Sequence, residues 1–133
     1  MVIGGSFDRL HAGHRRLLKL VCALRPLRLV VGVTGDAMLR AAGKPGFKLV
    51  QPFPARRDAL IRALGEYAPA CLTVVEVHEL LDPFGPSVVD SELTAIAAST
   101  ETEAGAVAVN ARRSQAGLRK LDVFLVGRHM NAV

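Results

Sequence analysis

Short runs of apolar residues alternate along the chain with segments in which apolar residues recur at the spacing of a helix. A run such as Leu29–Val33 is apolar apart from one glycine and rich in β-branched residues, which is typical of a strand buried on both faces of a parallel sheet. Runs of this kind predict five strands, at Met1–Gly4, Leu29–Val33, Leu72–Val77, Thr94–Ala98 and Leu121–Val126.

Three longer segments between these runs carry the helical pattern. In the first of them, Leu17 and Val21 fall on one face, and basic residues lie mainly on the other. The predicted helices span Ala12–Leu24, Pro54–Leu64 and Glu103–Ala116, with Gly65 after the last turn of the second. Thr34–Lys48 is predicted to be a loop with one turn of helix at Ala37–Leu39. His78–Glu92 is predicted to be a long loop, and loops of this length in compact domains are usually functional or mobile.

The alternation of strands and helices predicts an α/β fold, a Rossmann-like three-layer sandwich in which helices cover both faces of a five-stranded parallel sheet. A chain of 133 residues without repeats fits one domain, residues 1–133. No apolar run approaches the roughly 20 residues that a membrane-spanning helix requires, and the N-terminus lacks a signal-peptide pattern. We therefore expect a cytoplasmic protein that does not contact membranes.

The net charge of +5 is unevenly distributed. Residues 1–62 hold twelve Lys and Arg against three Asp and Glu, whereas residues 63–111 hold eight acidic and no basic residues. Five Phe, one Tyr and no Trp are too few aromatic residues for a face that stacks nucleic-acid bases, so we expect a small anionic ligand and no nucleic-acid partner. Cys22 and Cys71 each stand among apolar residues without metal-ligand spacing, which predicts buried thiols and no metal site.

The most distinctive stretch follows the first predicted strand and ends in the first turn of the first predicted helix. It is Gly4-Gly5-Ser6-Phe7-Asp8-Arg9-Leu10-His11-Ala12-Gly13-His14. A glycine turn between a strand and a helix N-terminus is typical of phosphate-binding sites, because unpaired backbone N–H groups and the helix dipole converge there. The stretch is neither a dinucleotide fingerprint nor a Walker loop. It predicts a nucleotide-handling site over which two histidines reach the same bound group.

This stretch resembles the signature of the nucleotidylyltransferase superfamily, whose members share an H-x-G-H motif. Three further stretches resemble more closely the phosphopantetheine adenylyltransferases of the archaeal type, a family that also provides a domain of eukaryotic bifunctional coenzyme A synthase. These stretches are Val31–Leu39, Asp82–Ser87 with Asp90, and Ser99–Thr102 followed by Gly105, Asn110, Arg113, Gly117 and Leu118. The similarity covers nearly the whole chain, from about Val2 to Val126.

The resemblance implies that 4′-phosphopantetheine and ATP, with Mg²⁺, are converted to dephospho-coenzyme A and pyrophosphate. The nucleophile would be a phosphate oxygen that is already anionic, so catalysis needs positioning and charge stabilisation rather than a covalent intermediate. We expect His14 to contact the transition state and His11 to hold the nucleotide phosphates. The motif residues assigned to ATP and substrate binding are Gly4, Gly5, Ser6, Phe7 and Gly13. Gly5 lets the backbone approach closely, Gly13 keeps a side chain out of the way, and Ser6 can hydrogen-bond the attacking phosphate or the α-phosphate. Ser6 could instead only form the turn.

The resemblance assigns further side chains outside the motif. Lys44 is expected to meet the acceptor phosphate, with Lys48 as its rival. Arg56 is expected to bind substrate, the alternative being a salt bridge on a helix surface. Arg113 could contact ATP phosphates or cap its helix. Two residues after the fourth strand are expected to line the adenine side, namely Glu101 and Thr102.

The loop that contains Asp82-Pro83-Phe84-Gly85-Pro86 has two interpretations. It could cover the pantetheine arm of the acceptor, or it could be no more than a rigid turn.

The chain departs from the superfamily pattern after its last strand. A Ser/Thr-rich phosphate-binding motif that ends near an arginine is absent from Gly127–Val133, which leaves open a nucleotidylyltransferase domain that is truncated at its C-terminus. Two alternatives to the adenylyltransferase stand beside it. One is a different small-molecule nucleotidylyltransferase, such as a cytidylyltransferase, and the other is a non-catalytic nucleotide-binding remnant. A monomer is the favoured oligomeric state.

Overall fold

The computed structural model describes residues 1–41, 43, 49–67, 74–99 and 102–126. Among these residues, five parallel strands form one sheet in the order β3-β2-β1-β4-β5. The strands are β1 (Val2–Gly5), β2 (Arg28–Thr34), β3 (Val74–Leu80), β4 (Ala95–Ser99) and β5 (Asp122–Val126). The α/β fold with a five-stranded parallel sheet that the sequence predicts is therefore confirmed.

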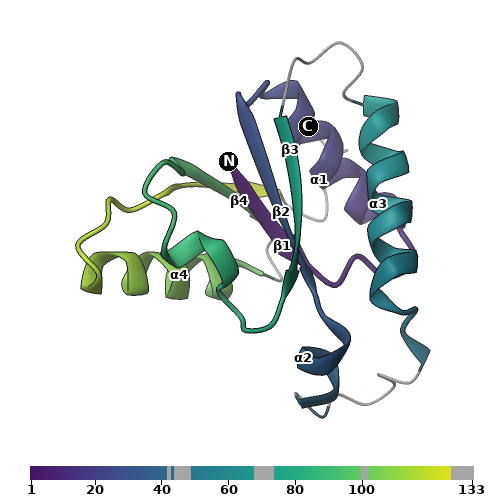
Figure 1. Cartoon of the computed structure of the whole chain (residues 1–133). Helices are drawn as coiled ribbons and strands as arrows, with labels where there is room; N and C mark the ends of the chain where they lie inside the picture. The colour runs from purple at the N-terminus through teal and green to yellow at the C-terminus, as the bar shows by residue number, and fades with distance from the viewer. Residues whose placement is uncertain (42, 44–48, 68–73, 100–101, 127–133) are drawn as a thin grey trace.

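Helices cover both faces of this sheet. Figure 1 shows α1 (Ala12–Ala23) and α3 (Phe53–Tyr67) on one face, and α4 (Glu103–Gln115) on the other. The short α2 (Asp36–Ala41) continues from the end of β2, below the sheet in the same view, and the 3₁₀ helix η2 (Gly85–Val88) lies beside α4. This arrangement is the predicted three-layer sandwich.

Side chains that alternate along the strands build two apolar cores. In β1, Ile3 joins the core that α1 and α3 cover, and Val2 joins the core that α4 covers. Both are almost fully shielded from solvent, as their neighbours Val30 and Val31 in β2 are. Burial on both faces of the sheet explains why the central strands are apolar throughout.

Three elements extend further than the sequence pattern predicts. One is α3, which continues through Gly65 to Tyr67, and the others are β3 and α2. The third strand was expected at 72–77, of which 72 and 73 lie outside the described residues; it continues to Leu80, because pairing with β2 holds as far as Thr34 opposite Leu80. The polar residues His78 and Glu79 hide this extension from a hydrophobicity pattern, and an edge strand tolerates them. The turn of helix predicted at 37–39 is the six-residue helix α2.

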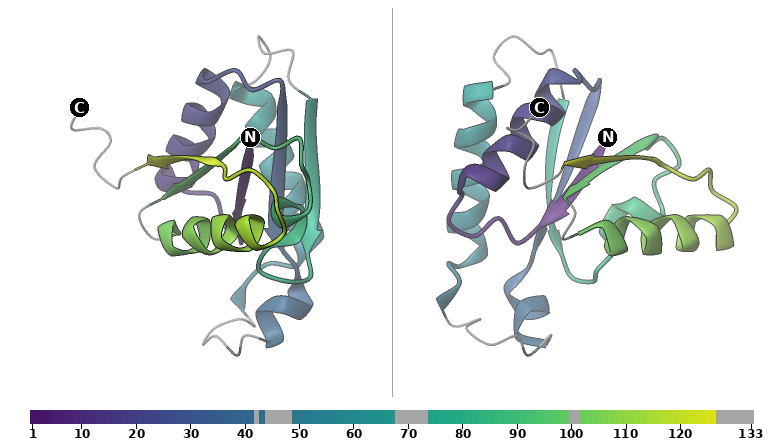
Figure 2. Two further views of the ribbon diagram at one scale, coloured as in Figure 1. Left: turned by 90° about the vertical axis from the view of Figure 1, so that its left-hand side faces the viewer. Right: turned by 180° about the vertical axis from the view of Figure 1, so that it is seen from behind.

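The order of the strands determines where the motif lies relative to the sheet. From the central β1 the chain moves outward to β2 and β3, and it then returns to the other side of β1 for β4 and β5. The carboxyl ends of β1 and β4 therefore form the switch point at which ligands bind in open α/β sheets. The loop from β1 to α1, which contains the motif, starts at this point, as both views of Figure 2 show.

Candidate active site

The loop between β1 and α1 is held in a conformation that ordinary residues rarely adopt. Phe7 and Arg9 have φ angles of 50° and 44°, in the left-handed region that costs a non-glycine residue energy. Phe7 offsets that cost by burying its ring in the core at 2% exposure. The Arg9 guanidinium is fixed by Asp8 and by the carbonyl of Leu49. The side chain of Phe7 is thus an anchor, and a contact with a ligand is left to its backbone.

The two histidines of the motif cap α1 and stack on each other. His11 is the N-cap residue, and its Nδ1 accepts the N–H of Gly13 at 3.0 Å. His14 lies one turn on, and its Nδ1 accepts the N–H of His11 at 3.3 Å. The ring centroids lie 3.9 Å apart, with 23° between the planes. This is the reciprocal pattern of a capping box, built here from two imidazoles.

The cap also fixes which ring nitrogen carries the proton. A backbone N–H can only donate, so each Nδ1 must be an unprotonated acceptor, and each neutral ring then carries its proton on Nε2. His11 is exposed and His14 is partly exposed at the helix N-terminus. Two Nε2–H donors therefore stand beside the positive end of the helix dipole, an arrangement suited to phosphate oxygens.

Gly13 is required by this stack. A Cβ at Gly13 would lie 2.9 Å from Cε1 of His11 and 3.2 Å from its Nδ1. The predicted role of Gly13, keeping a side chain out of the way, agrees with this geometry, and the group protected is the His11 ring. Gly4 and Gly5 end β1 opposite Gly32 and Val33 of β2, and Ser6 follows at the start of the loop.

Arg56 lies beneath the motif loop, inside the protein. Its side chain is fully buried, and it donates to the backbone carbonyls of Ser6 and Thr34 and to the carboxylate of Asp36. The Arg56 side chain is therefore not placed to contact substrate directly. The alternative salt bridge exists, with Asp36 at 2.8 Å, but it is buried on the arginine side rather than on a helix surface.

The segment before α3 is tied to the motif by side chains that the sequence analysis did not assign to the site. Asp8 accepts the N–H of Gln51 at 3.0 Å, and Asp36 accepts the N–H of Phe53 at 3.1 Å. Both aspartates follow carboxyl ends of neighbouring strands, a signal that becomes informative only once the strand order is known. Beside this segment lies a cavity of about 170 Å³ lined by Asp36, Leu39, Arg40, Val50 and Pro52.

Thr102 lies at the same edge of the sheet, beside the end of β4. It precedes α4, and its Oγ1 accepts the N–H of Ser99 at 2.9 Å. The Thr102 side chain thus bonds to the last residue of β4, and its predicted place beside the adenine stays a prediction. Glu101, Lys44 and Lys48 lie outside the described residues, so their predicted contacts also stay predictions.

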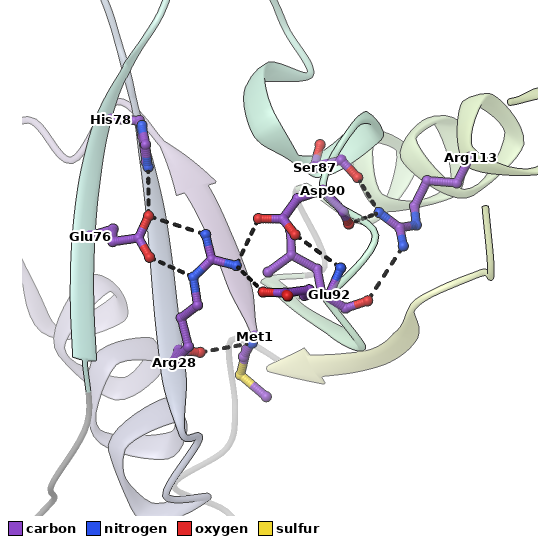
Figure 3. A network of polar contacts seen from close by, with 9 residues as sticks. Met1, Arg28, Glu76, His78, Ser87, Asp90, Glu92 and Arg113 are labelled. Atoms are coloured by element: carbon purple, nitrogen blue, oxygen red, sulfur yellow. Dashed lines mark hydrogen bonds and ion pairs between the residues drawn. The ribbon is translucent and has the colours of Figure 1, made fainter.

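Arg113 is not part of this edge. Its buried guanidinium donates to the carbonyls of Ser87 and Asp90, as Figure 3 shows. It also donates to the carbonyls of Leu93 and Arg119. Leu93 and Arg119 precede β4 and β5, so Arg113 lies toward the amino ends of the strands, opposite the motif. The prediction that Arg113 contacts ATP phosphates is therefore wrong. Instead of capping its helix, the Arg113 side chain anchors the loop that leads to β4.

A second ionic cluster also lies toward the amino ends of the strands. Arg28 pairs with Glu76 and with Asp90, while the N-terminal amine of Met1 donates to the Arg28 carbonyl (Figure 3). The Arg28 guanidinium and then the His78 ring lower the pKa of Glu76 to about 2. This cluster joins β2, β3 and the loop after η2, so its role is structural.

The loop at 82–86 forms a tight turn. Asp82 Oδ1 accepts the N–H groups of Gly85 and Phe84, each at 2.8 Å, and these bonds hold the pKa of Asp82 below its ordinary value. The Phe84 ring packs against the core under α4, with the Arg112 guanidinium 4.5 Å from its centroid. The rigid turn is thus present, and a contact with the pantetheine arm stays a prediction.

The described residues contain neither a membrane-spanning helix nor a cluster of metal-binding side chains. None of their helices is long and apolar enough to cross a membrane. Nor do three or more of their His, Cys, Asp or Glu side chains gather in a way that could hold a metal ion. Cys22 is buried as predicted, and Cys71 lies outside the described part of the chain.

Comparison with known proteins places the chain in a family. The profile of the Cytidylyltransferase-like family matches residues 2–103. Proteins named phosphopantetheine adenylyltransferase from Methanopyrus kandleri and Pyrobaculum aerophilum are 39% and 38% identical to the chain. Their alignments cover 95% of this chain and 76% and 77% of those relatives.

Solved structures agree with the fold. A protein of unknown function from Archaeoglobus fulgidus superimposes with a TM-score of 0.79 at 28% identity, over 94% of this chain and 87% of that one. A lipopolysaccharide core biosynthesis protein from Thermoplasma volcanium, at a TM-score of 0.68 and 21% identity over 94% and 93% of the two chains, shares the fold alone. With its strand order and its histidine pair at the switch point, the chain belongs to the Cytidylyltransferase-like family and, within it, to the family of the archaeal phosphopantetheine adenylyltransferases.

Proposed function

We propose that the protein transfers the adenylyl group of ATP to 4′-phosphopantetheine, giving dephospho-coenzyme A and pyrophosphate. The observation that carries this proposal is the stacked pair His11 and His14, whose Nε2–H groups stand at the N-terminus of α1 beside the switch point of the sheet. The names of the archaeal relatives supply the substrates.

The reaction needs no covalent intermediate. A phosphate oxygen of 4′-phosphopantetheine attacks the α-phosphorus of ATP and forms a P–O bond. The bond from the α-phosphorus to the oxygen that bridges it to the β-phosphorus breaks, and the electron pair leaves with pyrophosphate. Negative charge therefore builds up on the α-phosphate oxygens and on the leaving group, where fixed donors stabilise it.

The histidine pair is proposed to supply such donors. The Nδ1 of His14 accepts the His11 N–H, and in this proposal the Nε2 of the same ring donates to the α-phosphate. His11 in turn donates to the phosphates on the open side of the helix end. Removing one donor of this kind typically lowers the rate by about 10²–10³-fold.

Mg²⁺ enters with ATP in this proposal. The ion is usually bound through substrate phosphates and keeps several waters, and its charge offsets that of the leaving pyrophosphate. The site is proposed to work within a monomer in the cytoplasm. Gel filtration at the concentration of the assay tests the oligomeric state.

The proposal is tested by measuring pyrophosphate release and by identifying the nucleotide product by mass. The protein is incubated with 4′-phosphopantetheine, Mg²⁺ and either ATP or CTP. We expect dephospho-coenzyme A from ATP, and a fall of about 10²-fold or more in H14A. H78A is the matched control, because His78 is an exposed histidine on the edge strand β3, away from the motif. Transfer from CTP but not from ATP would contradict the choice of nucleotide, and the absence of any transfer would favour a binding remnant.

A further inference from the structure

Arg56 has an unusual set of partners for a buried arginine. Its Nη1 donates to the carbonyls of Ser6 at 2.8 Å and of Thr34 at 2.7 Å, and its Nε donates to the carbonyl of Gln51 at 2.8 Å. Its Nη2 donates to Asp36 at 2.8 Å. Four of the five N–H groups of the guanidinium are therefore used within the protein.

These partners come from different segments of the site edge. Ser6 begins the motif loop after β1, Thr34 is the last residue of β2, and Asp36 opens α2. Gln51 lies in the segment that Asp8 of the motif also holds. One planar group on α3 thus sets the relative positions of the segments that follow β1 and β2.

The geometry of the guanidinium is what makes this possible. A lysine ammonium keeps the charge but has three donors around one nitrogen, so it cannot reach carbonyls that lie on opposite sides of a planar fork. A buried charge is also expensive to leave without partners, so these bonds strongly favour one arrangement of the loops. The reaction rate depends steeply on the geometry of the site, because a displacement of about 1 Å can lower a rate about 10²-fold.

We infer that Arg56 is a positioning residue for the transfer site. It acts through Ser6 and Thr34, by holding the start of the motif loop at the end of β2, and it does not bind substrate. This inference rests on the proposed function for its kinetic test, and on the structure alone for its spectroscopic test.

Arg113 provides a matched control elsewhere in the fold. It is equally buried and it also donates to backbone carbonyls, but it lies toward the amino ends of the strands. A substitution of either arginine by lysine keeps a charge and removes a similar set of bonds. Loss of stability is therefore expected in both variants, whereas loss of site geometry is expected only in R56K.

The experiment compares R56K, R113K and the wild-type chain. Pyrophosphate release is measured as kcat and as KM for ATP and for 4′-phosphopantetheine, and each rate is divided by the folded fraction from urea unfolding. Backbone amide NMR spectra of the free proteins follow Gly4, Gly5 and Gly13. D36N is a milder variant that keeps the shape of the partner if R56K fails to fold.

We expect R56K to lower kcat per folded molecule by about 10–100-fold, and R113K to stay within about two-fold of the wild type. We also expect the amide signals of the motif glycines to shift in R56K and D36N but not in R113K. A rise in KM for one substrate with unchanged kcat would overturn the inference in favour of direct binding. Equal effects of R56K and R113K, or unmoved glycine signals, would also overturn it.

An inactive wild-type chain would contradict the proposed function but would not bear on the positioning role of Arg56. The glycine amide signals would then decide the positioning role by themselves.

Discussion

The substitution G13A separates the stability of α1 from the geometry of its histidines. Alanine is favoured over glycine in a helix by about 1 kcal/mol. The added Cβ, however, would stand 2.9 Å from Cε1 of His11, whereas carbon atoms in contact lie about 3.5–4.0 Å apart. The ring must therefore move by roughly 0.6–1 Å, which breaks the bond from the Gly13 N–H. Loss of an N-cap costs about 1 kcal/mol, so the two contributions nearly cancel.

We therefore expect G13A to unfold within about 1 kcal/mol of the wild type. Adenylyl transfer should fall by about 10²-fold, because His11 and the ring stacked on it no longer stand where the phosphates bind. Urea unfolding gives the first quantity, and kcat/KM from pyrophosphate release gives the second.

The matched control is G65A, in the last turns of α3 and away from the site edge. A Cβ there meets nothing within 4 Å, and no positive φ is present at this glycine. We expect G65A to gain about 1 kcal/mol of stability with unchanged transfer. If G13A transferred as fast as G65A, the position of the His11 ring would not limit the reaction and the reasoning would be refuted.

Two further predictions concern structure outside the site. The pKa of Glu76 is about 2 against an ordinary value of 4.5, so its pairing with Arg28 stabilises the fold fully above about pH 4.5 and is lost as the pH falls toward 2. Urea unfolding as a function of pH should therefore show a smaller acid loss in E76Q than in the wild type, and equal slopes would disprove this. Gly85 has a φ of 53°, and its added Cβ would meet Leu80 Cδ2 at a clashing distance, so G85A should lose about 2 kcal/mol in the same assay. G117A, with positive φ but open space, should lose less, and an equal loss would contradict the clash with Leu80.

The local features of this fold follow from local sequence patterns. Apolar runs such as Leu29–Val33 set the strands, and the glycine turn with H-x-G-H places the motif at a helix N-terminus. His14 lies in the first turn of α1 because the helix begins directly after His11. Here the spacing of neighbouring residues determines the geometry, so the sequence is sufficient.

The parts that could not be predicted depend on contacts between distant residues. Arg56 and Arg113 each stand in an Ala-Arg-Arg run of the sequence, yet one lies at the site edge and the other at the opposite edge. Their roles require the strand order and the direction in which each helix returns across the sheet. Phe7 is similar, because only the packed core shows that its ring is an anchor.

The central claim is that the pair at the start of α1 catalyses adenylyl transfer to 4′-phosphopantetheine. The most direct measurement is the ratio of dephospho-coenzyme A to pyrophosphate formed from ATP, 4′-phosphopantetheine and Mg²⁺ by the wild-type chain and by H14A. We expect a one-to-one ratio with the wild type and a rate that is lower by about 10²-fold or more with H14A. Equal rates in the two proteins, or pyrophosphate release without dephospho-coenzyme A, would contradict it.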